Sequence, residues 1–95
     1  MPVSFKVASS IRYRIIDDEA VVVRQREGDV VVLNQVAARV LELVGANLSP
    51  DEMVAALVEE YEADEETIRA DVERFLAELQ ELRVIEPARS SRNPR

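Results

Sequence analysis

The chain has 95 residues, of which 47% are hydrophobic and 33% charged, values typical of a single folded domain. It contains no cysteine and no histidine, which excludes disulfides, thiolate nucleophiles, the usual zinc sites and every catalytic arrangement that uses histidine as a base. The absence of these two residue types favours a binding protein over an enzyme and leads us to expect no cofactor and no metal. The formal net charge is −7.

The charge is concentrated in one half of the chain. Residues 1–45 carry six basic and six acidic residues, whereas residues 46–86 carry thirteen acidic and three basic ones, a net charge of −10. A nucleic-acid-binding surface is basic, because neutralisation of phosphates supplies most of the affinity. The acidic half therefore argues against a nucleic-acid partner and favours a neutral or basic one, while most of these carboxylates are expected simply to be solvated.

The two ends of the chain are predicted to lie outside the domain. The first ten residues, MPVSFKVASS, lack the basic start and apolar run of a signal peptide, and no stretch of 18 apolar residues follows. We therefore expect no membrane partner and a cytoplasmic location. Residues 1–10 are predicted to be a flexible segment, residues 11–85 the domain, and residues 86–95 a disordered basic tail.

Residues 11–33 have the alternation and the β-branched content of strands. Two short turns, DDE and EGD, separate the apolar runs, and turns this short join neighbouring antiparallel strands. The pattern predicts a three-stranded meander. Its strands are IRYRII (11–16), AVVVRQR (20–26) and VVVL (30–33).

The chain from residue 34 to about residue 83 has the period and the capping signals of three helices. Ser49 and Glu52 form a capping box with proline between them, and the last helix carries its apolar residues on one stripe. The predicted N-caps are Asn34, Ser49 and Asp64, and Gly45 ends the first helix in the C′ position. Strands followed by helices predict an α+β fold, with three helices on one face of a small sheet.

The predicted third strand, 30–33, has no charge and no proline, so its free edge is open to another strand. Either a helix of the same domain covers this edge, or a partner strand pairs with it, as in peptide recognition by strand addition. The last helix would supply one wall of such a site through Asp71, Glu78, Arg74 and Phe75. The simpler interpretation leaves Phe75 in the core and the acids in solvent.

The order of these motifs resembles the PqqD family, the recognition elements of ribosomally synthesised and modified peptides (RiPPs). The resemblance covers residues 11–85 and includes IDDEAVVV, VVLN, AARVLELV followed by glycine, SPDEMVAALVEEY and DVERFLAEL. It is carried by the pairs Leu33-Asn34, Asp71-Val72 and Phe75-Leu76. Each motif is weak alone, and the order and spacing make the match specific.

The resemblance implies a three-stranded antiparallel sheet with three helices, like a winged helix-turn-helix, and a non-catalytic function. Such an element binds the leader segment of a precursor peptide as a strand added to its third strand, with the leader's side chains in the groove beside the third helix. Carried onto this chain, the pairing edge is Val30, Val31, Val32 and Leu33, and the groove lining is Asp71, Arg74, Phe75 and Glu78.

The resemblance also implies partner enzymes. The closest likeness is to the free-standing leader-binding proteins of lasso-peptide clusters, whose partners are a leader peptidase and a cyclase. The alternative is a PqqD-type protein that presents its precursor to a radical SAM enzyme, as in pyrroloquinoline quinone synthesis. One departure is Arg83, where family members often have glycine. Arginine in a left-handed conformation costs about 1–2 kcal/mol, so the third helix is expected to end differently here.

Two other functions compete with this one. A winged-helix DNA-binding protein has a compatible topology, but the helix that would enter the groove is acidic. A small enzyme or metal protein would have to use carboxylates alone, and neither the run DDE nor the run EADEE has the glycine-containing spacing of a calcium loop. Both runs are better interpreted as a turn and a helix start.

Overall fold

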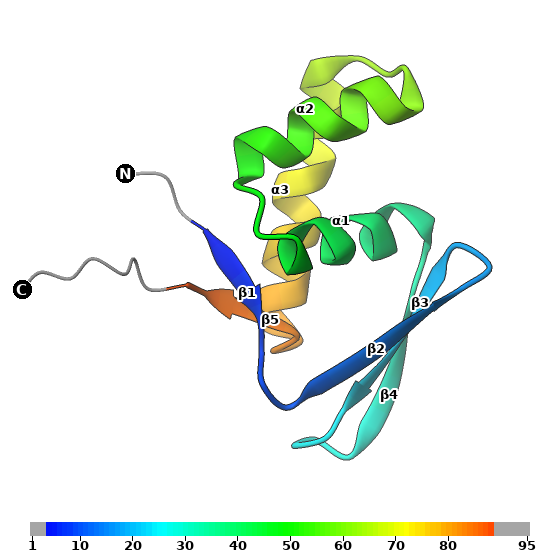
Figure 1. The fold of residues 1–95 in the computed structure, drawn as a ribbon, viewed down its shortest axis with the longest axis vertical. Helices are drawn as coiled ribbons and strands as arrows, with labels where there is room; N and C mark the ends of the chain where they lie inside the picture. The colour runs from blue at the N-terminus through cyan, green and yellow to red at the C-terminus, as the bar shows by residue number, and fades with distance from the viewer. Residues whose placement is uncertain (1–3, 89–95) are drawn as a thin grey trace, which may run out of the picture.

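The computed structural model describes residues 4–88, which form two small antiparallel sheets and three helices (Figure 1). In chain order the elements are β1 (Phe5–Val7), β2 (Ile11–Ile16), β3 (Glu19–Arg24), β4 (Asp29–Leu33), α1 (Gln35–Gly45), α2 (Pro50–Tyr61), α3 (Glu65–Glu81) and β5 (Ile85–Pro87). The predicted α+β class and the three-stranded meander, with strand order β2-β3-β4, are confirmed.

The turns of the meander follow from their residues. Asp17 and Asp18 both have positive φ, as a two-residue hairpin turn requires, and aspartate tolerates this conformation better than most residues. The turn between β3 and β4 is longer than the predicted EGD, because β3 ends at Arg24 and β4 begins at Asp29. Gly28 supplies the positive φ in this turn.

The second sheet, β1 with β5, was not predicted. Phe5 pairs with Pro87 and Val7 with Ile85, and the side chain of Phe5 is buried. The predicted domain of 11–85 therefore omits β1 and the end of β5, and residues 5–7 do not belong to a flexible segment. A three-residue strand is too short to show a period, and its partner lies about 80 residues away in the sequence. The rest of the predicted tail, 89–95, lies outside the described residues.

The helix starts confirm the capping signals. Asn34 Oδ1 accepts a hydrogen bond from the Ala37 N–H at 3.0 Å, and Asp64 Oδ2 accepts one from the Thr67 N–H at 3.1 Å. At Ser49 the capping box is complete, since Glu52 Oε1 also accepts a bond from the Ser49 N–H at 2.8 Å.

The end of α1 differs from the prediction. Gly45 is the last helical residue, and Asn47, two residues later, adopts the left-handed conformation with φ of 71°. Packing favours glycine here: a Cβ atom at residue 45 would lie 3.1 Å from the hydroxyl oxygen of Tyr13, which would have to move by a few tenths of an ångström. Asparagine is the residue that best replaces glycine at a left-handed helix end.

The end of α3 also differs from the prediction. Arg83 has φ of 63°, so the helix ends as it would with glycine, in spite of the strain. The Val84 N–H donates to Leu79 O at 2.9 Å, and the Arg83 N–H donates to Gln80 O at 3.0 Å. These two bonds satisfy carbonyls that the helix itself leaves free.

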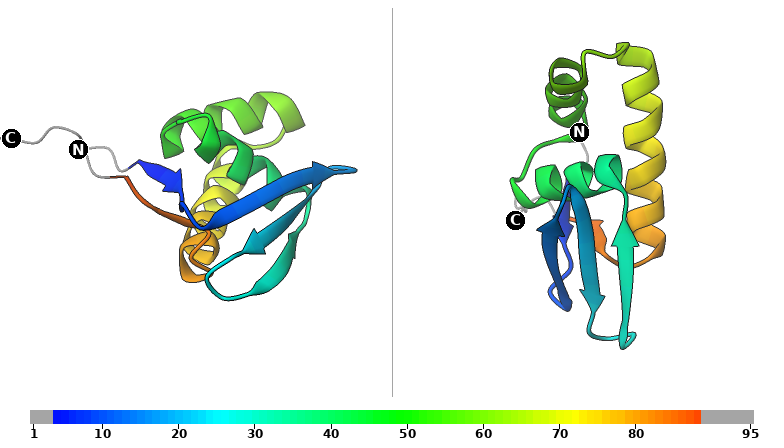
Figure 2. Two further views of the ribbon diagram at one scale, coloured as in Figure 1. Left: turned by 60° about the horizontal axis from the view of Figure 1, so that its bottom comes forward. Right: turned by 90° about the vertical axis from the view of Figure 1, so that its right-hand side faces the viewer.

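The core lies between the helices and the inner face of the three-stranded sheet. All three helices lie on one side of this sheet and leave its other face uncovered (Figure 2). The apolar stripe predicted for α3 is buried, as are the inward residues of β3. The fully buried side chains of largest volume are Leu41, Met53, Leu57, Leu79, Ile85, Val22, Val40, Val72 and Val84. Within residues 4–88, no helix combines the length and the apolar character needed to cross a bilayer.

Candidate functional site

The strand β4 lies at the edge of the sheet, as predicted for 30–33. Among the described residues β4 pairs with β3 alone, so its other edge carries main-chain groups without a strand partner. The side chains of β4 alternate: Val30 and Val32 are 58% and 60% exposed on the outer face, whereas Leu33 is buried and Val31 half-buried on the helix side. The edge is therefore uncharged at its centre and apolar on both faces.

The four predicted residues of α3 form a single stripe, because they are spaced three or four residues apart. Phe75 is buried at the margin of the core, and Glu78 is exposed. Arg74 contacts two other residues of the stripe. Its Nη2 atom lies 3.4 Å from Asp71 Oδ1, and its guanidinium carbon lies 4.8 Å from the centroid of the Phe75 ring. The accessible part of the stripe thus carries charges of both signs, and the Phe75 ring lies largely buried beneath them, as the simpler interpretation of the sequence expected for this residue.

The helix α3 and the free edge of β4 lie on the same side of the domain. In the right-hand view of Figure 2, α3 runs along the side of the domain on which β4 forms the margin of the sheet. The predicted site residues therefore fall into two groups, one on the edge strand and one on the helix beside it.

Arg24 connects the start of β4 to the end of α3 and was not singled out from the sequence. Its Nε and Nη2 atoms donate to the two carboxylate oxygens of Asp29 at 2.7 and 2.6 Å, and its Nη1 atom donates to Leu82 O at 2.8 Å. Arg24 is the last residue of β3, Asp29 the first of β4, and Leu82 caps α3. The available signal was the direct pairing of Arg24 with Asp29 across the hairpin.

The electrostatics follow from this geometry. The hydrogen bonds from Arg24 lower the pKa of the Asp29 carboxyl below its ordinary value, and partial burial opposes the shift. The same bonds raise the pKa of Arg24, so the pair is charged at neutral pH. The other pKa shifts in the described chain lie at Arg39, Tyr61 and Arg69, away from β4.

Two open hollows on the surface of the described residues lie away from β4. One, of about 490 Å³, lies between α2 and α3 and is lined by Val54, Val58 and Arg69 among others. A second, of about 520 Å³, lies below the end of α3, with Arg26 and Arg83 in its lining. Neither hollow is lined by any predicted site residue. The candidate site is thus an open edge beside a helix, which is what an added strand needs. Among residues 4–88 no cluster of three or more potential ligands is arranged to hold a metal ion.

Known proteins share both the sequence pattern and the fold. The model of the family described as coenzyme PQQ synthesis protein D (PqqD) matches residues 19–85. The structure of TbiB1 in complex with the TbiA(beta) leader peptide is similar, with 30% identity and a TM-score of 0.80 over 85% of this chain and 94% of that chain.

Two further solved structures share the fold. The PqqD truncation of Methylobacterium extorquens PqqCD, which represents a functional, stand-alone RiPP recognition element, has 27% identity and a TM-score of 0.71 over 88% of each chain. A lasso peptide synthetase B1 complexed with its leader peptide has 24% identity and a TM-score of 0.79, covering 88% of this chain and 99% of that chain. No curated protein matches the chain.

Proposed function

The chain belongs to the PqqD family, and on this premise we propose that it is a non-catalytic recognition element that binds the leader segment of a ribosomally made precursor peptide. The leader pairs with the free edge of β4 as an added strand. Its side chains on the helix side enter the space beside α3, where Asp71, Arg74, Phe75 and Glu78 line the groove. The element then delivers the precursor to separate enzymes, a leader peptidase and a cyclase, as in lasso-peptide biosynthesis.

The observation that carries this proposal is the uncharged edge of β4 beside an amphipathic helix stripe. Main-chain donors and acceptors along Val30–Leu33 offer affinity without catalytic side chains, and alternate side chains of the added strand give specificity. The similarity to TbiB1, whose structure contains a leader peptide, supports a peptide as the occupant of this chain's edge.

A second candidate function uses the same site for a different pathway. The family model and the PqqD truncation both favour a PqqD-type protein, which presents its precursor to a radical SAM enzyme. The resemblance of the chain to the leader-binding proteins of lasso-peptide clusters favours the first. The two candidate functions differ in the partner enzyme and not in the leader-binding edge. A leader-binding experiment therefore tests the step that both functions have in common.

The proposal is tested by calorimetric titration of the chain with a synthetic leader from the precursor gene encoded beside it. We expect nanomolar to micromolar affinity. Successive N–H groups of a strand point to opposite sides, so one of the two variants Val31→Pro and Val32→Pro removes a donor from the free edge. That variant should stay folded and lose most of its affinity.

The matched control is Val32→Thr, which keeps both the main-chain N–H and the β-branched side chain. It should bind the leader within about twofold of the wild type and confirm that the loss in the proline variant comes from the main chain. If both proline variants fold, as circular dichroism would show, and both bind the leader like the wild type, strand addition to β4 is wrong.

A further inference from the structure

The side chain of Arg24 lies where three elements meet. It is 14% exposed, and its planar guanidinium uses two N–H groups on Asp29 at the start of β4 and a third on Leu82 O at the end of α3. Leu82 O belongs to the last turn of the helix, whose carbonyls have no partner within the helix and form the negative end of its dipole. Each of the three bonds therefore joins a positive donor to a negative or partly negative acceptor.

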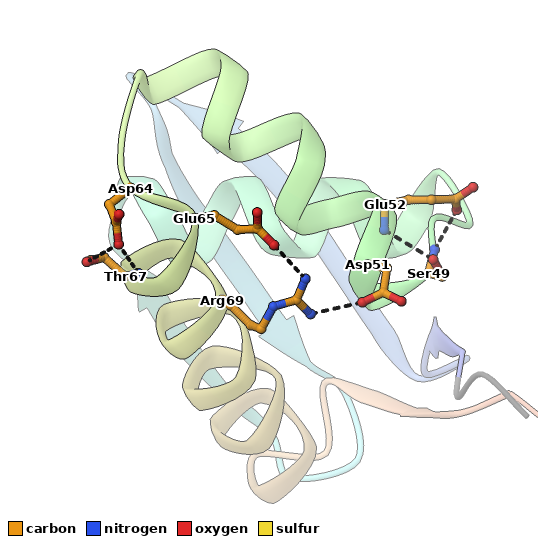
Figure 3. A network of polar contacts seen from close by, with 7 residues as sticks. All are labelled: Ser49, Asp51, Glu52, Asp64, Glu65, Thr67 and Arg69. Carbon is orange, nitrogen blue, oxygen red and sulfur yellow. Dashed lines mark hydrogen bonds and ion pairs between the residues drawn. The ribbon is translucent and has the colours of Figure 1, made fainter.

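The helix α3 is held by an arginine at each end, and only one of the two is connected to β4. At the other end Arg69 donates to Asp51 on α2 at 2.9 Å and to Glu65 in the first turn of α3 at 3.1 Å (Figure 3). This second pair of bonds ties α3 to α2, on the far side from the sheet edge. Each arginine bonds to two partner residues. A variant of Arg69 therefore loosens α3 from α2 alone, whereas a variant of Arg24 loosens α3 from β4.

We infer that Arg24 is a positioning residue for leader binding: it fixes the start of β4 relative to the end of α3 and so sets the width of the space that the leader strand enters. This inference rests on the proposed function. An added strand needs main-chain bonds to β4 and side-chain contacts with α3 at the same time, and their separation decides whether one strand can make both. A guanidinium with both acceptors engaged is rigid, so the spacing is set before the leader arrives.

The direct test compares Arg24→Gln with Arg69→Gln, with titration of the same synthetic leader and urea unfolding of each variant. Both changes remove an arginine that bonds to two elements, although the Arg24 side chain is 14% exposed and that of Arg69 41%. We expect Arg24→Gln to weaken leader binding at least tenfold, and Arg69→Gln to leave it within about twofold. Equal leader affinity in both variants and the wild type would overturn the inference.

Two further variants separate positioning from stability alone. Arg24→Lys keeps the charge, but a single ammonium group cannot form the paired bonds to Asp29 and also reach Leu82 O. We expect it to recover part of the stability and little of the leader affinity. Asp29→Asn should weaken leader binding. The double variant with Arg24→Gln should bind the leader no more weakly than Arg24→Gln alone, because both changes act through one contact. Full recovery of affinity by Arg24→Lys would show that charge suffices and would contradict a positioning role.

The outcomes distinguish a failure of the positioning role of Arg24 from a failure of the proposed leader-binding function. If the wild-type chain does not bind the leader, the proposed function fails. If the wild type binds the leader and Val31→Pro or Val32→Pro abolishes binding, while Arg24→Gln binds normally, the function stands and only the role of Arg24 is wrong. Amide chemical shifts of Val30–Leu33 in the free Arg24→Gln variant give a readout that does not require the leader. They should move if β4 shifts, and they should stay unchanged in Arg69→Gln.

Discussion

The guanidinium of Arg74 lies over the ring of Phe75, with its central carbon 4.8 Å from the ring centroid. The ring is buried at the margin of the core, while the arginine side chain is 57% exposed and also pairs with Asp71 at 3.4 Å. One exposed cation thus covers the outer part of an aromatic residue and holds a carboxylate beside it. In the proposed site, this contact forms the border of the groove on the helix side.

The variant Arg74→Gln tests whether this border contributes to leader binding. An exposed cation–π contact and a surface ion pair each contribute up to about 1 kcal/mol, so the free energy of unfolding should change little. The leader should bind several-fold more weakly in a calorimetric titration, because the border of the groove loses the cation that covers Phe75 and holds Asp71 in place. Arg14→Gln, an exposed arginine on the outer face of β2, is the matched control and should have no effect. Unchanged affinity in Arg74→Gln would place the groove elsewhere.

The strain at Arg83 predicts a stabilising substitution. Its φ of 63° costs a residue with a Cβ atom about 1–2 kcal/mol, and glycine removes this cost while losing some conformational entropy on folding. Arg83→Gly should therefore raise the free energy of unfolding by up to about 1 kcal/mol in urea. Glu81→Gly, in the last turn of α3 with ordinary helical geometry, should lower it by about the same amount. A loss of stability in Arg83→Gly would mean that the arginine side chain makes a compensating contact.

The Arg24–Asp29 pair predicts an acid-sensitive contribution to stability. The pKa of Asp29 is lowered in the folded state by the bonds from Arg24, so the contribution is complete above the pKa of the unfolded chain. It is lost as the pH falls through the lowered value. Glu27 is the other nearby carboxylate that acts on Arg24. The stability difference between the wild type and Asp29→Asn, measured by urea unfolding at each pH, should be greatest at neutral pH.

That stability difference should shrink between roughly pH 5 and pH 2, where acid protonates the carboxyl and the two chains become equivalent at this position. Glu65→Gln, which removes the charge of one acceptor of Arg69 instead, is the control for general acid effects. A difference between the wild type and Asp29→Asn that stays constant through this range would show that the ion pair does not contribute.

Most of the fold was predictable because its signals are local. The caps Asn34, Ser49 and Asp64, and the apolar stripe of α3, each depend on residues within two turns of a helix, and the structure has them as predicted. The pairing of β1 with β5 was not predictable, since three residues give no period and the partner is distant in the sequence. The close approach of Tyr13 to Gly45 was not predictable either, since the two residues lie far apart in the sequence.

The candidate site was predictable in part. The meander order predicted that the third strand lies at an edge, and the strand order β2-β3-β4 confirms it. The absence of charge along Val30–Leu33 indicated that this edge is open to another strand. The contact of Arg24 with Leu82 O spans 58 residues and joins a side chain to a main-chain atom, so no side-chain pattern in the sequence marks it. The roles of Asp71, Arg74, Phe75 and Glu78 toward a leader remain predictions.

The most direct test of strand addition is amide hydrogen exchange of β4, followed residue by residue by NMR with and without the synthetic leader. The amides of Asp29–Leu33 form two alternating sets, one directed at β3 and one at the free edge. In the free chain the edge set should exchange fast, and saturation with the leader should slow its exchange by at least a hundredfold, while the set bonded to β3 changes little. A leader that binds tightly and protects no additional amide of β4 would contradict the account.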